Sequence, residues 1–186
     1  MVKHRHVTSS KTIAYGSDAV NRARFKGVIT TTMNKACPVI LRVAQNNELE
    51  ILAFKHPMAG NQLVKGTIEG HETLEQACIR ELEEESGLIG EVECNLGIWD
   101  SGYKDHIWGF CLVRVKAPLK NEWSFFTEDD GGLNFNFFWQ PLNSELNSEW
   151  HDLFKGAVAF IKKAIISSKT NAHCVRSGVQ KATSPF

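Results

Sequence analysis

GTIEGHETLEQACIRELEEESGL, residues 66–88, is the stretch that decides the fold of this chain. Its first seven residues are rich in glycine and polar side chains, which is typical of a loop. Beyond Thr73, apolar residues recur at helical spacing, at Leu74, Ala77, Cys78 and Leu82. Thr73 and Gln76 fit a capping box, and Gly87 fits a helix C-cap. The stretch therefore predicts a loop followed by a helix that begins after Thr73 and ends at Gly87.

This helix carries a cluster of glutamates. Glu81 lies three and four residues before Glu84 and Glu85, so the three carboxylates share one face, whereas Glu83 points elsewhere. Like charges at these spacings destabilise an isolated helix by about 0.2–0.5 kcal/mol per pair. Mg²⁺ would remove that repulsion, because it favours oxygen ligands and is commonly shared between carboxylates and phosphates. The competing interpretation is a solvated acidic face, which is the usual role of a charge run.

The wider spacing favours the metal site over a solvated face. The stretch matches the pattern GX5EX7REUXEEXGU, where U is aliphatic, at Gly66, Glu72, Arg80, Glu81, Leu82, Glu84, Glu85, Gly87 and Leu88. With ordinary residue frequencies, a chance match has a probability on the order of 10⁻⁷ or less. The stretch resembles the Nudix box at every position, and the chain is identified as a member of the Nudix hydrolase family.

This resemblance implies an α/β fold, a Nudix-type α/β/α sandwich with a mixed β-sheet and a catalytic loop–helix–loop. It also implies Mg²⁺ or Mn²⁺ as cofactor, bound by Glu81, Glu84 and Glu85 together with a backbone carbonyl of Gly66 or Lys65. Three further residues match structural positions of the box. Glu72 and Arg80 correspond to the pair that ties the loop to the helix by charge-assisted bonds, and Gly87 closes the helix.

The implied activity is that of a metal-dependent pyrophosphohydrolase. Metal ions neutralise phosphate oxygens and lower the pKa of a bound water, and a carboxylate must then accept the proton of that water. Glu81 is the first choice for this base. Some Nudix enzymes instead use an acidic residue of a later loop, which here is TEDDGG with Glu128, Asp129 and Asp130. For each of these three residues, a plain acidic turn is the competing interpretation.

Several residues are candidates for substrate binding. The box opens with Lys65 and Gly66, as in Nudix members that hydrolyse dinucleoside polyphosphates and in mRNA-decapping enzymes, and Lys65 would meet a phosphate. Tyr103 follows the box at nearly the distance of a tyrosine that marks dinucleoside polyphosphate hydrolases. Trp108 or Phe110 would stack on a base, with burial in the core as the competing interpretation. Arg42 is a further phosphate ligand candidate, unless it is a surface charge.

The leading functional hypothesis is hydrolysis of a nucleoside diphosphate linked to another moiety, such as a nucleotide or a dinucleoside polyphosphate. One alternative is an RNA 5′-end pyrophosphohydrolase. The 21 basic and 21 acidic residues argue mildly against it, because extended RNA contacts need several basic side chains along a groove. The other alternative is a regulatory Nudix domain that binds a nucleotide without cleaving it. Such domains usually lack a box glutamate, and none is missing here.

The rest of the chain predicts a mixed α/β domain. β-Branched and apolar runs predict strands at 36–44, 49–54, 91–100, 106–116 and 133–140. The polar QNNE between the first two predicts a hairpin turn, and residues 63–70 form a short extended piece. A second helix is expected within 148–166, where apolar residues form one stripe.

At 186 residues the chain suits one domain, which we place at 36–166. An N-terminal extension at 1–35 precedes it and either packs on the domain or stays apart. A polar C-terminal tail at 167–186 follows it. The basic, Ser- and Thr-rich start is compatible with a transit segment or with a loosely docked terminus. No apolar run approaches the roughly 20 residues of a membrane span, and the five cysteines form no CxxC pair. We therefore expect a cytoplasmic protein. Many Nudix proteins are dimers, which leaves a homodimer open.

Overall fold

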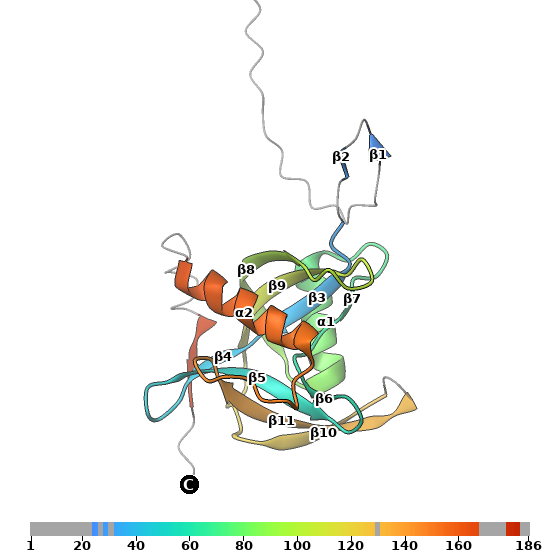
Figure 1. Ribbon diagram of the computed structural model, residues 1–186. Helices are drawn as coiled ribbons and strands as arrows, with labels where there is room; N and C mark the ends of the chain where they lie inside the picture. Colours follow the sequence, from blue (N-terminus) through green and yellow to red (C-terminus); the bar gives the residue numbers. More distant parts are fainter. Residues whose placement is uncertain (1–23, 26–27, 30–31, 129–130, 168–177, 183–186) are drawn as a thin grey trace, which may run out of the picture.

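Two β-sheets lie between two helices, as Figure 1 shows with α2 in front of the sheets and α1 behind them. This is a computed structural model that describes residues 24–25, 28–29, 32–128, 131–167 and 178–182. Helix α1 spans Leu74–Ser86 and helix α2 spans Asp152–Ser167. The predicted α/β class and both predicted helices are confirmed.

The first sheet has the order β7-β3-β9-β8. These strands span Gly66–Thr67 (β7), Lys35–Val39 (β3), Ile107–Val115 (β9) and Gly90–Asp100 (β8). β3 runs parallel to β9, whereas β7 and β8 run antiparallel to their neighbours. The parallel pair at the centre makes the sheet mixed, as predicted.

The second sheet has the order β10-β11-β5-β4-β12, and β6 pairs with β5 outside that path. Its strands span Trp123–Thr127 (β10), Leu133–Pro141 (β11), Leu49–His56 (β5), Leu41–Val43 (β4), Gln180–Lys181 (β12) and Gly60–Gln62 (β6). β12 runs parallel to β4, and the other pairs are antiparallel. A separate pair is formed by β1 (Arg24–Phe25) and β2 (Val28–Ile29).

The prediction of one continuous strand at 36–44 is wrong. The run divides at Ile40 into β3, which belongs to the first sheet, and β4, which belongs to the second. Both halves are almost entirely buried, so no alternation of polar and apolar residues marks the point where the chain changes sheets. The predicted hairpin with β5 is confirmed, and Asn47 in its turn has a φ of 64°.

The strands predicted at 91–100, 106–116 and 133–140 are confirmed as β8, β9 and β11. β10 was not predicted. β12 was not predicted either, and it lies inside the stretch expected to be a polar C-terminal tail. Most of the predicted N-terminal extension, 1–35, lies outside the described residues, and the domain boundaries stay predictions.

The sheets bury a core on each side, and β9 contributes to both. Cys111 and Val113 point into the core beneath α1, whereas Trp108 and Phe110 point into the core beneath α2. A strand that is covered on both faces has a continuous run of apolar residues in its sequence. In the described part of the chain, neither helix is long and apolar enough to cross a membrane.

Candidate active site

Helix α1 begins and ends where the sequence predicted. The Thr73 hydroxyl accepts a hydrogen bond from the backbone N–H of Gln76 at 3.3 Å, and the Gln76 side chain accepts one from the N–H of Thr73 at 2.9 Å. Gly87 adopts a left-handed conformation with φ of 70° and donates its N–H to the Glu83 carbonyl at 2.8 Å. These caps fix the phase of the helix, and with it the direction of each glutamate.

Two of the box glutamates are buried under the segment that precedes the helix. The Glu81 residue is 5% exposed and Glu85 is 8% exposed. The Glu81 carboxylate lies against Gly66, where an added Cβ would sit 1.8 Å from the carboxyl carbon. The Glu85 carboxylate accepts a hydrogen bond from the backbone N–H of Lys65 at 3.3 Å. Two acidic groups therefore meet the backbone of one dipeptide, and the first residue of the box must lack a side chain.

Arg80 ties the box loop to the helix, as predicted. Its Nε and Nη2 donate to the two carboxylate oxygens of Glu72 at 2.7 and 2.8 Å, and Nη2 also donates to the Thr67 carbonyl at 2.9 Å. The bond to Arg80 lowers the pKa of Glu72, and the same bond raises the pKa of Arg80 above its usual value. The pair is a bidentate, charge-assisted contact that fixes residues 67–72 to the middle of α1.

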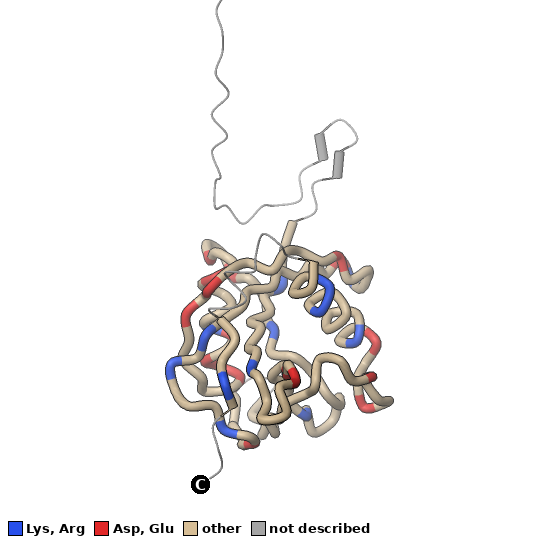
Figure 2. The backbone as a smooth tube through the Cα atoms, turned by 90° about the vertical axis from the view of Figure 1, so that its left-hand side faces the viewer, with Lys and Arg blue, Asp and Glu red and all other residues tan. Residues whose placement is uncertain are grey.

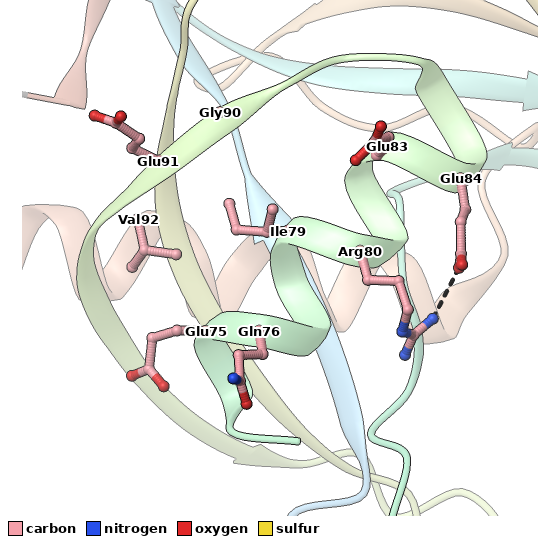
Figure 3. Close-up of a pocket in the computed structure, with 9 residues that line it drawn as sticks. All are labelled: Glu75, Gln76, Ile79, Arg80, Glu83, Glu84, Gly90, Glu91 and Val92. Carbon is pink, nitrogen blue, oxygen red and sulfur yellow. Dashed lines mark hydrogen bonds and ion pairs between the residues drawn. The ribbon is translucent and has the colours of Figure 1, made fainter. Parts of the chain in front are cut away.

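The same guanidinium reaches two more glutamates. Arg80 Nη1 donates to Glu81 Oε1 and to Glu84 Oε2, both at 2.8 Å, and Figure 3 shows the contact with Glu84. One cation is thus shared among Glu72, Glu81 and Glu84. Within the described residues, no three His, Cys, Asp or Glu side chains converge closely enough to form a metal site as they stand.

The donor set nevertheless suits a hard divalent cation. Its side chains offer carboxylate oxygens, which Mg²⁺ and Mn²⁺ prefer. Glu81 and Glu85 are buried, and buried carboxylates need compensating positive charge. The Glu84 side chain is 48% exposed, so rotation about its own side-chain bonds would let it exchange Arg80 for another cation.

A family model supplies an independent observation. The model for the NUDIX domain matches residues 34–153, which is more than half of the chain.

The chain belongs to the Nudix family.

Solved structures agree with this Nudix assignment at the level of the fold. One is an ADP-ribose pyrophosphatase from Streptococcus suis, with 15% identity and a TM-score of 0.52 over 73% of this chain and 90% of that one. Another is the Nudix hydrolase RenU from M. smegmatis, with 16% identity and a TM-score of 0.50 over 73% of this chain and 88% of that one. Among curated proteins, none matches the sequence. Identities this low support the shared fold and leave the substrate to be argued from the site.

A pocket of about 770 Å³ lies beside the Nudix helix, and Arg80 and Glu84 are among the residues that line it. Figure 3 shows Ile79 and Val92 at its centre, with the carboxylates of Glu75, Glu83 and Glu91 around them. Glu81 and Glu85 do not line it. Because its charged rim is mainly acidic, this pocket would repel a phosphate group. Its size therefore does not make it the site of phosphate chemistry.

Two predicted base-stacking residues lie in the core of this Nudix protein. Trp108 is fully buried, with Trp99 and Phe154 packed edge-to-face against it at 5.9 and 5.7 Å between ring centroids. Phe110 is also fully buried and stacks on Phe160 at 5.0 Å. The prediction of a base platform on these rings is corrected, because α2 covers the face of β9 from which they project.

Arg42 is also not placed to bind a phosphate. It is buried, donates to the Glu50 carboxylate at 2.7 Å and donates to the Asn121 side chain at 2.9 Å. Its guanidinium carbon lies 4.2 Å from the centroid of the Trp139 ring. The prediction of a substrate contact is corrected, because the Arg42 side chain is held by these three neighbours.

The other predicted residues are accessible. Glu128 is exposed directly after β10, whereas Asp129 and Asp130 lie outside the described residues. Tyr103 is 42% exposed in the loop between β8 and β9, and Lys65 is partly exposed next to Gly66. All of these remain candidates.

Sequence reasoning missed two basic residues, Lys35 and His106, which strand pairing brings toward the box. Lys35 donates from Nζ to the Thr67 hydroxyl at 2.6 Å, and His106 lies directly before β9. No motif includes either residue. Only the pairing of β3 with both β7 and β9 would have revealed them.

Proposed function

We propose that this Nudix protein is a metal-dependent pyrophosphohydrolase that cleaves a diphosphate linkage in a nucleoside diphosphate joined to another moiety. One observation carries the proposal. The carboxylates of Glu81 and Glu85 are buried against Lys65 and Gly66, where the start of the box loop packs on the helix. A solvated acidic face would leave them exposed, as Glu83 is.

In this proposal Glu81, Glu84, Glu85 and the Gly66 carbonyl hold Mg²⁺ or Mn²⁺. When bound, such an ion neutralises phosphate oxygens and makes a bound water a better nucleophile. Glu84 would have to leave its bond with Arg80 to join this set. Arg80 retains its contacts with Glu72 and Thr67, so the loop stays anchored while Glu84 moves.

Glu81 is the proposed general base, and it accepts the water proton on a carboxylate oxygen. Its position is fixed on one side by Gly66 and on the other by Arg80 Nη1. Glu128 stays the competing choice, because it is exposed at the end of β10.

Neither alternative function is favoured by a specific observation. Figure 2 shows the backbone positions of Lys and Arg scattered among those of Asp and Glu, whereas an extended RNA contact would need basic residues gathered together. A regulatory domain without activity is also not indicated, since each box glutamate is present and buried or held by Arg80. The cytoplasmic location and the homodimer stay predictions.

The test is a panel of nucleotides with Mg²⁺ or Mn²⁺, followed by identification of the products. We expect metal-dependent release from at least one substrate, and a loss of turnover of at least about 10²-fold in Glu84→Gln with unchanged thermal stability. Glu83→Gln is the matched control, because it removes an exposed carboxylate one residue away on another face. Tight binding without product release would favour a regulatory domain, and near-normal turnover of Glu84→Gln would exclude the proposed site.

A further inference from the structure

The acidic pocket beside α1 joins one stripe of that helix to the edge of a sheet. Its helix side carries Glu75, Ile79 and Glu83, which recur every four residues and so share one face of α1. Its strand side is formed by residues 90–92, the start of β8, and Figure 3 shows them beside that stripe. β8 is the last strand of its sheet, and in the described part of the chain only β9 pairs with it. The pocket therefore borders an open sheet edge.

The backbone at this edge points its polar groups outward. Ile89 accepts a hydrogen bond from the N–H of Lys116, the residue opposite it, at 2.9 Å. Hydrogen-bonded pairs alternate along antiparallel strands, so Gly90 and Val92 direct their N–H and C=O groups away from β9. Val115, the strand partner of Gly90, agrees with this phase, because its own N–H and C=O bond a side chain of β12 at 2.9 and 3.0 Å. Four backbone groups therefore face the open edge.

Apolar side chains form the floor of this groove, and a carboxylate lies at each end. Ile79 and Val92 are half-buried and pack on the core beneath α1. Glu75 and Glu83 are exposed, and neither forms an ion pair with another residue that the structure describes. Glu91 also lines the groove, but two basic side chains already hold its carboxylate. A binding partner would thus meet an apolar surface with one uncompensated negative charge at either end.

The two carboxylates are spaced to match an extended chain. Eight residues of α1 separate Glu75 from Glu83, which is about 12 Å along the helix axis. In a β-strand, residues i, i+2 and i+4 share one face, and i and i+4 lie about 13 Å apart. A strand added beside β8 would place its i and i+4 side chains at the two carboxylates. Its i+2 side chain would then lie over Ile79 and Val92.

We propose that this groove binds an extended segment of another protein as an antiparallel strand on the edge of β8. The segment has the pattern basic–x–apolar–x–basic, where basic is Lys or Arg and apolar is Leu, Ile, Val or Phe. Its backbone exchanges hydrogen bonds with Gly90 and Val92, while its alternate side chains fit the groove and give specificity. No stretch of this chain's sequence fits the pattern, so the partner is a different polypeptide. This interaction is separate from the proposed hydrolysis.

A second copy of this chain does not suit the same edge. Antiparallel pairing of two β8 edges through Gly90 and Val92 would place Glu91 opposite the same residue of the other copy, and like charges at such positions are destabilising. β8 also contains no Lys or Arg that could neutralise the two carboxylates of α1. Register shifts after Val92 limit regular pairing to the start of the strand. The acidic edge therefore selects a short basic strand.

A small organic cation is the other kind of occupant that an apolar pocket with carboxylates can hold. It would pair with one carboxylate and contact the floor, but it would leave the backbone groups of the β8 edge unpaired. Arg80 does not oppose either occupant, because its guanidinium already donates to three carboxylates. The dependence of binding on the partner's backbone therefore distinguishes a strand from a small cation.

The experiment measures binding of the full chain to the fluorescent peptide Gly-Lys-Ser-Leu-Ser-Lys-Gly, with blocked ends, by fluorescence anisotropy. We expect saturable binding with a Kd below about 1 mM. Methylation of the Leu backbone nitrogen should weaken binding by at least about tenfold, because this N–H faces β8. Methylation of the preceding Ser nitrogen should change Kd by less than about twofold, because that N–H points away from β8. Replacing Leu with Ser should weaken binding by about fivefold.

Variants of the groove provide the matching test on the protein. Glu75→Gln combined with Glu83→Gln should weaken binding of the unmodified peptide by about threefold to tenfold, as for two exposed ion pairs. Glu145→Gln is the matched control, because it removes an exposed carboxylate that does not line the groove. The control should bind the peptide as wild type does.

Several results would overturn the proposal. These are no saturable binding up to about 1 mM, equal affinity for the two methylated peptides, equal affinity for a peptide with the order Lys-Lys-Ser-Ser-Leu, or unchanged affinity in the double variant. Displacement of the peptide by butylammonium at an equal concentration would identify a small-cation site instead. Because the titration uses neither metal nor nucleotide, its failure would leave the proposed hydrolysis unaffected, and an inactive protein could still show the peptide preference.

Discussion

Gly66→Ala is the substitution whose effect the structure specifies most closely. A methyl group on residue 66 would lie 1.8 Å from the Glu81 carboxyl carbon and 1.9 Å from each of its oxygens. Non-bonded carbon atoms pack at about 3.5–4.0 Å, so the carboxylate must move by roughly 1.5–2 Å. That displacement also strains its 2.8 Å bond with Arg80. The substitution therefore relocates the proposed base and metal ligand while leaving its chemistry unchanged.

The size of the effect follows from this displacement. A misplacement of about 1 Å at a reacting group costs on the order of 10²-fold in rate, so kcat/KM should fall by at least about 10²-fold. This corresponds to about 2.7 kcal/mol of transition-state stabilisation. Overpacking costs about 1–3 kcal/mol of folding stability, which leaves a folded protein. The loss of kcat/KM in Gly66→Ala should therefore be larger than its loss of folding stability can explain.

The assay is kcat/KM on the best substrate of the panel with saturating Mg²⁺, together with thermal melting. Gly70→Ala is the matched control in the same loop, because a Cβ there meets nothing within 4 Å. Its φ of 37° makes alanine unfavourable by about 1 kcal/mol, so it reports backbone strain alone. Activity of Gly66→Ala within about threefold of wild type, or an equal loss in Gly70→Ala, would show that the added methyl group does not displace Glu81 from its working position.

Three further predictions concern stability. Arg80→Lys should lower the free energy of unfolding in guanidinium by about 1–3 kcal/mol, because an ammonium group cannot reproduce the bidentate contact with Glu72; an unchanged midpoint would argue against that link. Arg80 lowers the pKa of Glu72 in the folded protein, so their contact stabilises the fold at pH values above the unfolded pKa of about 4.3. That stabilisation is lost as the pH falls through the folded-state pKa of Glu72. Unfolding measured from pH 6 to 3 should thus depend less on pH in Glu72→Gln, and an identical dependence would contradict the shift. Trp108→Leu should lower the free energy of unfolding by about 2–4 kcal/mol and leave KM unchanged, because the Trp108 ring lies in the core. A raised KM with unchanged stability would instead indicate that Trp108 stacks on a base.

The sequence alone predicted those features that depend on local spacing. Thr73 and Gly87 determine where α1 begins and ends, and the helical period then separates Glu81 from Glu83. The contact between Arg80 and Glu72 followed from the family pattern. Each of these relations lies within a short segment, so neighbouring residues were sufficient to indicate it.

The features that sequence reasoning missed depend on partners far along the chain. The change of sheets at Ile40 depends on β3 pairing with β9 while β4 pairs with β5. Arg42 is held in part by Asn121, 79 residues away. Trp108 is buried because α2 covers its face of β9, and Lys35 reaches the box through two strand pairings. A pattern of alternating residues indicates a strand but not what covers its two faces.

The proposed site requires that the carboxylates buried beside Gly66 bind a divalent ion. Its most direct test is Mn²⁺ binding by electron paramagnetic resonance to wild type, Glu85→Gln and Glu83→Gln. We predict that Glu85→Gln binds Mn²⁺ at least about tenfold more weakly, since it removes a charged oxygen ligand, while Glu83→Gln binds as wild type does. Equal Mn²⁺ affinity in all three proteins would mean that Glu85 is not a metal ligand.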